Sequence, residues 1–339
     1  MKRTILITGG AGFIGSNYIN FKSKEEDTRI INLDNLTYAS DLDNLEVTNT
    51  SNYTFIQGDI CDQKLVNDIF STYKIDTVVH FAAESHVDNS ISKPRAFIDT
   101  NIVGTFNLLS VANNFWMNAP NKCKDKYEQA RFLHISTDEV YGSLGNTGLF
   151  TESTPYAPNS PYSASKASSD MLVRSYFHTY GLPVLTTNCS NNYGPRQHDE
   201  KLIPTIIRKA IHQESIPIYG DGKNVRDWLY VEDHCCGIDL VLKKGRLGDT
   251  YNIGGKNERE NIYIATKICS ILDTLKPLSN QSSYKDLITY VKDRPGHDFR
   301  YAIDASKIES ELSWRADENF ETGIQKTIEW YLQKYKPKN

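Results

Sequence analysis

The feature that most constrains the fold is a glycine-rich stretch near the start of the chain, "ILITGGAGFIGS", at residues 5–16. An apolar, strand-like run ends at Gly10-x-Gly12-x-x-Gly15, and a helix-like sequence follows. Glycines at these positions let the backbone turn tightly and let a pyrophosphate approach the N-terminus of the helix. The motif alone is weak evidence, but a strand before it and a helix after it are the context that it requires. The stretch therefore predicts a dinucleotide-binding strand–turn–helix unit.

Two acidic residues at the ends of the next strands support this interpretation. Asp34 in "INLDNL" ends the second strand, where its carboxylate can bond both ribose hydroxyls of NAD. A 2'-phosphate would lie against that carboxylate, so NAD is expected rather than NADP. The alternative is an ordinary tight turn with a solvent-facing aspartate. Asp59 in "GDI" ends the third strand and is expected near the adenine, or else as the N-cap of the following helix.

Short apolar runs alternate with helical stretches over the first half of the chain. The runs expected to be strands buried on both faces are residues 4–10, 29–34, 54–60, 75–83, 131–137 and 183–190. The helix-like stretches lie at 13–25, 62–74 and 94–116, and residues 120–130 are expected as a hydrophilic surface insertion. This alternation predicts an α/β protein with a Rossmann-like, doubly wound parallel sheet.

After about residue 190 the pattern becomes rich in loops, polar residues and aromatic residues, which is typical of a substrate-binding part. We therefore expect an NAD-binding domain at residues 1–190, rejoined by about 225–255. A smaller, mixed α/β C-terminal domain for the substrate would be discontinuous, at 191–224 and 256–335.

Composition excludes several classes of function. The chain has 339 residues and a net charge of -4. This mildly acidic balance does not indicate binding to nucleic acid or to an anionic membrane. No apolar run is long enough to span a bilayer, and the N-terminal run is too short for a signal peptide. The six cysteines show no CxxC spacing, so we expect reduced thiols in a cytoplasm and no metal site.

Two further motifs carry reactive groups. The strand-like "FLHIST" runs into adjacent carboxylates, Asp138 and Glu139, which could be no more than a polar turn. "SPYSASKAS" places Tyr162 and Lys166 four residues apart, on one face of a helix, although a surface pair of this kind is common. A tyrosine with its usual pKa near ~10 is a poor base, and a nearby ammonium and a cationic nicotinamide would lower that pKa.

Taken together, these motifs resemble a known family. "TGGAGFIGS", "HFAAESHVDNS", "TNIVGT", "STDEVYG", "YSASK", "NCSNNYGP", "EKLIP", "RDWLYVEDH", "YNIGG" and "DRPGHDFRYAID" follow one another across nearly the whole chain. The sequence is similar to the dTDP-glucose 4,6-dehydratases, which are NAD-dependent sugar-nucleotide dehydratases of the extended short-chain dehydrogenase/reductase family. The acid pair in "TDE" carries the narrower resemblance, because the sugar-nucleotide epimerases of this superfamily have no such pair.

The resemblance implies a reaction in three steps, namely oxidation at C4, elimination of water across C5 and C6, and return of hydride to C6 with NAD regenerated. Tyr162 would take the C4 hydroxyl proton beside Thr137, Glu139 would remove the C5 proton, and Asp138 would protonate the leaving C6 hydroxyl. Such a pair needs one protonated and one ionised carboxyl. Adjacent strand residues point to opposite faces, so both acids reach one sugar only if the strand has ended by Asp138.

The resemblance also implies the residues that bind each ligand. The catalytic set is Thr137, Asp138, Glu139, Tyr162 and Lys166. The cofactor-binding residues are Gly9, Gly12, Phe13, Ile14, Gly15, Asp34, Asn35, Thr37, Asp59, Ile60, Ala82, Ala83, Ser85, Thr100, Tyr162, Lys166 and Asn192. The substrate-binding residues are Ser85, Thr137, Asn191, Lys201, Leu202, Pro217, Ile218, Tyr219, Arg226, Asn261, Asp293, Arg294 and His297. For residues 217–219 a core strand remains an alternative, and each cationic residue could be a solvated surface charge.

Some features leave the substrate and the assembly open. His198-Asp199 stands where the family usually has an aromatic-proline pair, so a uridine nucleotide is an alternative to the thymidine nucleotide. Asn35 replaces a common lysine and could loosen adenosine binding. The rival hypotheses are a UDP-glucose 4,6-dehydratase, a 4-epimerase, which has no use for the acid pair, and a non-catalytic NAD-binding protein. The resemblance also implies a homodimer through a four-helix bundle of the helices after Pro94 and around Tyr162.

Overall fold

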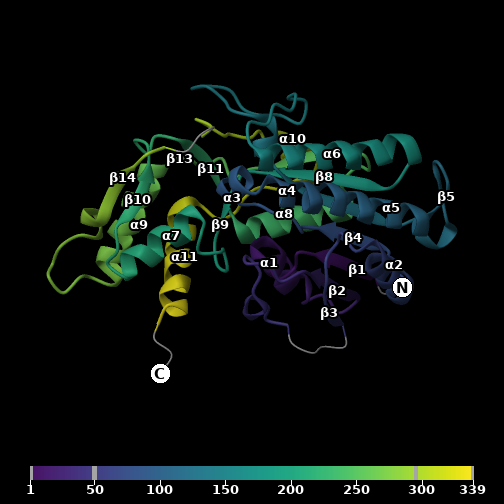
Figure 1. The fold of residues 1–339 in the computed structure, drawn as a ribbon, viewed down its shortest axis with the longest axis horizontal. Helices are drawn as coiled ribbons and strands as arrows, with labels where there is room; N and C mark the ends of the chain where they lie inside the picture. The colour runs from purple at the N-terminus through teal and green to yellow at the C-terminus, as the bar shows by residue number, and fades with distance from the viewer. Residues whose placement is uncertain (1–2, 48–51, 294–296, 337–339) are drawn as a thin grey trace.

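The computed structural model describes residues 3–47, 52–293 and 297–336. A parallel sheet with helices on both sides forms the larger part of the fold (Figure 1). Within it, seven strands follow the order β12-β8-β7-β4-β1-β2-β3, and every neighbouring pair is parallel. The strands are β1 (Arg3–Thr8), β2 (Thr28–Asp34), β3 (Tyr53–Gln57), β4 (Thr77–His80), β7 (Arg131–Thr137), β8 (Val184–Cys189) and β12 (Thr250–Ile253). The strand order reverses between β1 and β4, and such a switch point opens a crevice at the carboxyl ends of the strands. The predicted doubly wound sheet is confirmed.

Helices cover both faces of this sheet because its strands are apolar on both sides. Along β1, Ile5 and Ile7 belong to one core and Leu6 to the other, as the alternation of a strand requires. The first core is closed by α1 (Phe13–Lys22), α8 (Val231–Lys244) and α10 (Ser306–Leu312). The second is closed by α2 (Gln63–Tyr73), α5 (Thr105–Trp116) and α6 (Pro161–Tyr180).

The start of α6 is set by local sequence and positions two of the predicted catalytic residues. The Ser160 hydroxyl accepts a hydrogen bond from the Ser163 backbone at 3.1 Å, and Pro161 occupies the first helical turn. Both features favour a helix start. Tyr162 therefore lies in the first turn, and Lys166 lies one turn later on the same face.

The predicted single helix at 94–116 is interrupted. It consists of α4 (Pro94–Phe97), a π-helical segment η2 (Ile98–Gly104) and α5. At Gly104 a Cβ would lie 2.4 Å from Ile60 Cδ1, so the helix approaches the loop after β3 closely. The side-chain amide of Asn101 donates to Glu84 O at 3.0 Å and to Ser165 Oγ at 2.8 Å, which ties the π-helical segment to α6. π-Helical turns are often found at functional sites, and this one carries Thr100.

The second half of the chain builds a smaller mixed α/β unit with its own core, on the side of α7 and β10 in Figure 1. Its strands are β9 (Asn191–Tyr193), β11 (Val225–Tyr230) and β13 (Glu258–Glu260) in one sheet, and β10 (Ile216–Tyr219) with β14 (Ile288–Val291) in another. Its helices are α7 (Leu202–Ile211), α9 (Asn261–Leu275) and α11 (Phe320–Lys334). The segment 231–253 returns to the large sheet through α8 and β12, while β11 pairs in the small one.

The remaining elements are short. They are α3 (Val87–Ser92), β5 (Met117–Ala119), β6 (Lys122–Cys123), η1 (Leu42–Asn44), η3 (Asp125–Tyr127), η4 (Asp138–Tyr141) and η5 (Tyr284–Leu287). The predicted surface insertion at 120–130 is only partly exposed, because Tyr127 and Ala130 are buried in the core beside Trp116. Among the described helices, none has the length and apolar character needed to cross a membrane.

Candidate active site

A cavity of about 300 Å³ opens at the carboxyl ends of the strands, where the sheet order reverses. All the residues predicted to bind the cofactor line it. The glycine loop forms its floor and has no room for side chains. A Cβ on Gly9, whose φ is +70°, would lie 2.6 Å from Ala82 N, and one on Gly15 would lie 2.2 Å from Gly9 O. Because Gly9, Gly12 and Gly15 also line the cavity, their bare backbone faces it and fits a dinucleotide that lies against the loop.

Asp34 organises the two loops on one side of this cavity. Its carboxylate accepts hydrogen bonds from the backbone N–H of Ala11 at 2.9 Å, from that of Leu36 at 2.8 Å and from Ser40 Oγ at 2.9 Å. One side chain thus holds the glycine loop to the loop after β2 and still lines the cavity.

Asp59 lies beside Asp34 on the cavity wall. Its carboxylate accepts from Cys61 N at 2.8 Å and from the Asn35 amide at 3.3 Å. The N-cap of α2 is Asp62, whose carboxylate accepts from Leu65 N at 3.0 Å. The N-cap interpretation of Asp59 is therefore wrong, and its side chain is directed to the cavity wall.

The two adjacent acids occur where a strand changes into a helical turn. Strand β7 ends at Thr137, and η4 begins at Asp138. The Thr137 hydroxyl accepts from Glu139 N and donates to Asp138 Oδ1, each at 3.3 Å. Both acids line the cavity. The condition predicted from the sequence, a strand that has ended by Asp138, is confirmed.

The environments of the two acids differ. Asp138 is 1% exposed, whereas Glu139 is half-buried. Burial raises the pKa of the Asp138 carboxyl well above its usual range, and the negative charges of Glu139 and Asp227 raise it further. Asp138 Oδ2 has no hydrogen-bond partner among the described residues. Burial and the neighbouring negative charges thus favour the protonated form of Asp138 beside a second carboxyl group, the arrangement that divides acid and base roles.

Tyr162 and Lys166 lie against the same cavity and are 8% and 4% exposed. The Lys166 ammonium donates to Ile135 O at 2.8 Å. Burial raises the pKa of Tyr162 well above its usual value, Glu139 and Cys189 raise it further, and a hydrogen bond with Thr137 opposes them. Lys166, from which the sequence analysis expects a lowering of this pKa, is not among its principal causes; burial and Glu139 dominate it.

The predicted substrate-binding residues divide into two groups. Ser85, Thr137, Asn191 and Lys201 line the cavity, and Lys201 Nζ donates to Ser85 O at 2.9 Å across it. The others lie on the smaller unit outside the cavity lining; these are Leu202, Pro217, Ile218, Tyr219, Arg226, Asn261, Asp293 and His297. Arg294 lies outside the described residues.

Several of this second group are close to one another. His297 Nδ1 is 2.7 Å from Asp293 Oδ1, and the rings of His297 and Tyr219 lie edge to face with centroids 6.4 Å apart. The Arg226 guanidinium stacks 4.2 Å from the Tyr301 ring. Ile218 is 1% exposed in the core of the smaller unit, so the core-strand interpretation describes this residue.

Sequence reasoning missed part of the cavity wall. The additional lining residues are Leu33, Ala39, Ser40, Gly58, Phe81, Glu84, Ile135, Ser136, Cys189, Ser190, Gln197, His198 and Glu200. Most of them flank predicted residues at the ends of strands. Their position next to a strand end was therefore the sequence feature from which they could have been predicted to line the cavity. His198 and Asp199 have different surroundings. His198 lines the cavity, whereas Asp199 accepts from Lys334 Nζ at 3.1 Å and from Tyr335 OH at 2.6 Å near the end of α11.

Comparison with known proteins agrees with this geometry. A model of the family described as GDP-mannose 4,6 dehydratase matches residues 6–327, and the chain belongs to this family.

Within that family, the similarity is to the dTDP-glucose 4,6-dehydratases. The chain is 55% identical to the dTDP-glucose 4,6-dehydratase of Xanthomonas campestris pv. campestris over 330 residues, which are 97% of this chain and 93% of the relative. A dTDP-glucose 4,6-dehydratase from Bacillus anthracis, solved in complex with NAD, has a TM-score of 0.84 and 45% identity, over 98% of this chain and 97% of that one. The enzyme from Streptomyces venezuelae, with NAD and TYD bound, has a TM-score of 0.86 and 43% identity, over 97% of each chain.

Proposed function

We propose that this protein is a hydro-lyase that converts dTDP-glucose to dTDP-4-keto-6-deoxyglucose and water, with NAD as its regenerated cofactor. The observation that carries the proposal is the cavity that brings a protonated Asp138, Glu139 and Tyr162 together at the end of β7 and the start of α6. An epimerase needs no acid pair, whereas elimination of water needs an acid and a base.

The cofactor side of the cavity fits NAD. The glycine loop offers a backbone cradle, and the Asp34 carboxylate lies where it would accept bonds from ribose hydroxyls. A 2'-phosphate would meet the same negative charge, which favours NAD over NADP. When bound, NAD would supply a reversible hydride carrier, which accepts hydride from C4 and returns it to C6.

The groups of the chain would handle the protons. Tyr162 takes the proton of the C4 hydroxyl, and the hydrogen bond with Thr137 opposes the effect of burial on its pKa. The C4 ketone acidifies the hydrogen at C5, so Glu139 suffices as the general base that removes it. Asp138, protonated because it is buried beside Glu139, donates to the C6 hydroxyl, which leaves as water. Glu139 then returns its proton to C5, and release of the proton on Tyr162 balances the proton that Asp138 takes up again.

The substrate would extend from the acid pair toward the smaller unit. Ser85, Asn191 and Lys201 line the cavity on that side, and a cation such as Lys201 suits a diphosphate. The proposed division of the chain places residues 1–190 and about 225–255 on the NAD side, and 191–224 and 256–335 on the sugar-nucleotide side. The packing of α10 against α8 adds that helix to the NAD side.

The test is to incubate the purified protein with dTDP-glucose and, separately, with UDP-glucose. We expect the alkaline absorbance of a 4-keto-6-deoxy product, and loss of the mass of one water, from dTDP-glucose. Product mainly from UDP-glucose would overturn the base assignment and support the uridine alternative. A sugar nucleotide of unchanged mass would indicate epimerisation. Bound NAD without any reaction would support a non-catalytic protein.

We also propose a homodimer that forms through α5, α6 and the segments before them. Apolar side chains on these helices are exposed in the single chain, namely Ile91, Ile98, Val103, Phe106 and Met171. Met171 is 52% exposed and Phe106 44%, on two helices that pack against each other. A second copy would cover this surface as a four-helix bundle. We further propose a cytoplasmic location, which the free thiols of all six cysteines support.

A further inference from the structure

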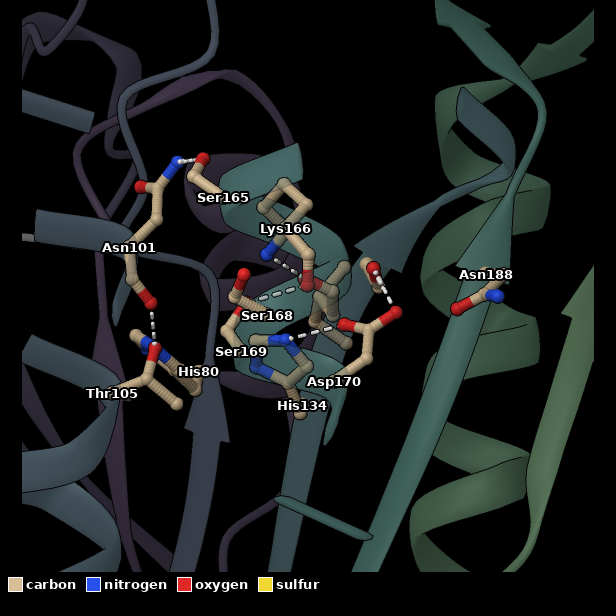
Figure 2. A network of polar contacts seen from close by, with 12 residues as sticks. His80, Asn101, Thr105, His134, Ser165, Lys166, Ser168, Ser169, Asp170 and Asn188 are labelled. Carbon is tan, nitrogen blue, oxygen red and sulfur yellow. Dashed lines mark hydrogen bonds and ion pairs between the residues drawn. The ribbon is translucent and has the colours of Figure 1, made fainter. Parts of the chain in front are cut away.

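A buried polar network lies around Asp170, close to the proposed catalytic residue Lys166, and is not used by the mechanism above (Figure 2). Its centre is Asp170 on α6, one helical turn after Lys166 and 4% exposed. The Asp170 carboxylate accepts hydrogen bonds from Ser136 Oγ at 2.8 Å and from Tyr156 OH at 3.0 Å, and His134 Nε2 lies 3.0 Å away. Three donors from β7 and from the loop before α6 thus hold one buried carboxyl group.

His134 does not neutralise this carboxylate. Its Nε2 faces Asp170, but its Nδ1 has no hydrogen-bond partner among the described residues. A charged imidazolium would therefore bury an unsatisfied N–H close to the Lys166 ammonium. Burial lowers the pKa of His134 well below its usual value, and Lys166 lowers it further. His134 is a neutral donor, so the opposite charge for Asp170 comes from elsewhere.

Lys166, one turn earlier on α6, is the cation whose charge acts on this carboxylate, and among the described residues the two groups influence each other without a direct ion pair. Its ammonium is buried and, within the part of the chain that the structure describes, makes one hydrogen bond, to Ile135 O. Burial lowers the pKa of Lys166, and the negative charge of Asp170 opposes that effect. The other titratable groups around Lys166 come from neighbouring strands, namely His80 on β4, His134 on β7 and Cys189 on β8. Burial keeps both histidines uncharged and raises the pKa of the Cys189 thiol, so Asp170 is the anion of this group.

We propose that Asp170 is a positioning residue for the reaction, and that its carboxylate is the buried countercharge that keeps the Lys166 ammonium protonated. The proposal rests on the proposed function, because there Tyr162 must give up its proton in a site where burial and Glu139 oppose ionisation. A charged Lys166 offsets that opposition, and a neutral Lys166 does not. His134, Ser136 and Tyr156 serve the same purpose indirectly, since their hydrogen bonds favour the ionised form of Asp170.

The network predicts a particular pH dependence. Burial raises the pKa of Asp170 to about 6, against the opposing effects of Lys166, Ser136 and Tyr156. Below that pH the carboxyl is protonated and Lys166 loses its countercharge. C4 oxidation should therefore lose rate on the acid side as Asp170 takes a proton, and on the alkaline side as Lys166 loses one.

The test isolates C4 oxidation. In the NAD-loaded Glu139→Gln protein, we expect dTDP-glucose to be oxidised at C4 and water loss to stall, so NADH accumulates and its rate of formation can be followed against pH. In that background, Asp170→Asn should move the alkaline limb of the pH–rate profile for NADH formation to lower pH by about one unit or more. Asp170→Glu, which keeps the charge, should restore the limb to within about half a unit.

A matched pair of tyrosine variants covers the case in which Asp170→Asn does not fold. Tyr156 and Tyr141 both bond Asn188, at 3.2 and 2.9 Å, but among the described residues only Tyr156 of the two also donates a hydrogen bond to Asp170. Tyr156→Phe should raise the pKa of Asp170 and move the acid limb up by about half a unit to one unit. Tyr141→Phe should leave that limb in place.

The outcomes separate the two proposals. If the Glu139→Gln parent forms no NADH from dTDP-glucose, the proposed function fails and the role of Asp170 fails with it. If NADH forms but neither limb moves in the Asp170 and Tyr156 variants, the function stands and Asp170 is merely structural. A readout that does not depend on turnover is the infrared band of a protonated carboxyl that is lost in Asp170→Asn, which should titrate near pH 6 in the protein alone.

Discussion

Replacing Asp34 by alanine tests how one carboxylate both shapes and lines the cofactor site. The variant leaves the buried N–H of Ala11 without its acceptor at 2.9 Å, together with the half-buried N–H of Leu36. An orphaned buried donor costs about 1–3 kcal/mol. A chain of 339 residues unfolds with an entropy of about 0.7 kcal/mol per kelvin, so Tm should fall by about 1–4 °C.

The same substitution should weaken NAD binding by more than the loss of stability explains. A hydrogen bond from a ribose hydroxyl to a charged acceptor contributes about 1.5–3 kcal/mol. Its loss corresponds to a Kd about 10–150 times higher. The preference for NAD over NADP should also fall, because the carboxylate that opposes a 2'-phosphate is gone.

The assay is calorimetric titration of the cofactor-stripped protein with NAD and with NADP, beside a thermal scan of each variant. Asp62→Ala is the matched control, because it removes an aspartate that caps α2 through Leu65 N, away from the cavity lining. It should cost about 0.5–2 kcal/mol of stability and leave the Kd for NAD unchanged. An unchanged Kd in Asp34→Ala would refute the ribose contact, and an unchanged Tm would refute its role in holding the loops.

Four other variants test the proposed acid, the preference for one nucleotide base and the proposed dimer interface. Asp138→Asn should change the free energy of unfolding by less than about 1 kcal/mol, because burial already favours the uncharged form of this carboxyl. It should slow water loss about 10²–10⁴-fold while NADH still forms. Unchanged product formation would show that Asp138 is not the acid. His198→Ala should change the ratio of kcat/KM for dTDP-glucose and UDP-glucose, since His198 lines the cavity. Asp199→Ala should instead lower Tm, because it removes the hydrogen bonds that Asp199 accepts near the end of α11. If the kcat/KM ratio changed in Asp199→Ala and not in His198→Ala, then Asp199 rather than His198 would contact the base. Met171→Glu, on the exposed face of α6, should give a monomer by light scattering, and a dimer that persists would place the interface elsewhere.

Local patterns were sufficient for the cofactor half of the site. Glycine spacing, the acid at the end of β2 and the apolar strands are short-range features, and the structure places Gly12, Asp34 and Ala82 on one cavity as expected. The change of β7 into η4 at Asp138 was also deducible, because two adjacent side chains can act on one sugar only where the strand has ended.

Other features depended on contacts between distant parts of the chain. The π-helical segment η2 interrupts a stretch that is helical by its own pattern, at a close approach between Gly104 and Ile60, which are far apart in sequence. The sequence pattern predicts Tyr127 to lie in a polar surface insertion, but its side chain is buried in the core beside Trp116. Neither outcome can be deduced from the composition of its own segment.

The sequence by itself determined the parallel sheet, the dinucleotide loop and the identity of the reactive side chains, because these follow from spacing within a few residues. Only the tertiary structure decided the charge of those side chains. The high pKa values of Asp138 and Tyr162 depend on burial and on charges from other elements of the fold, namely Asp227 for Asp138 and Glu139 for Tyr162. Solvation and Coulomb energies depend on three-dimensional distance, which spacing along the chain does not give.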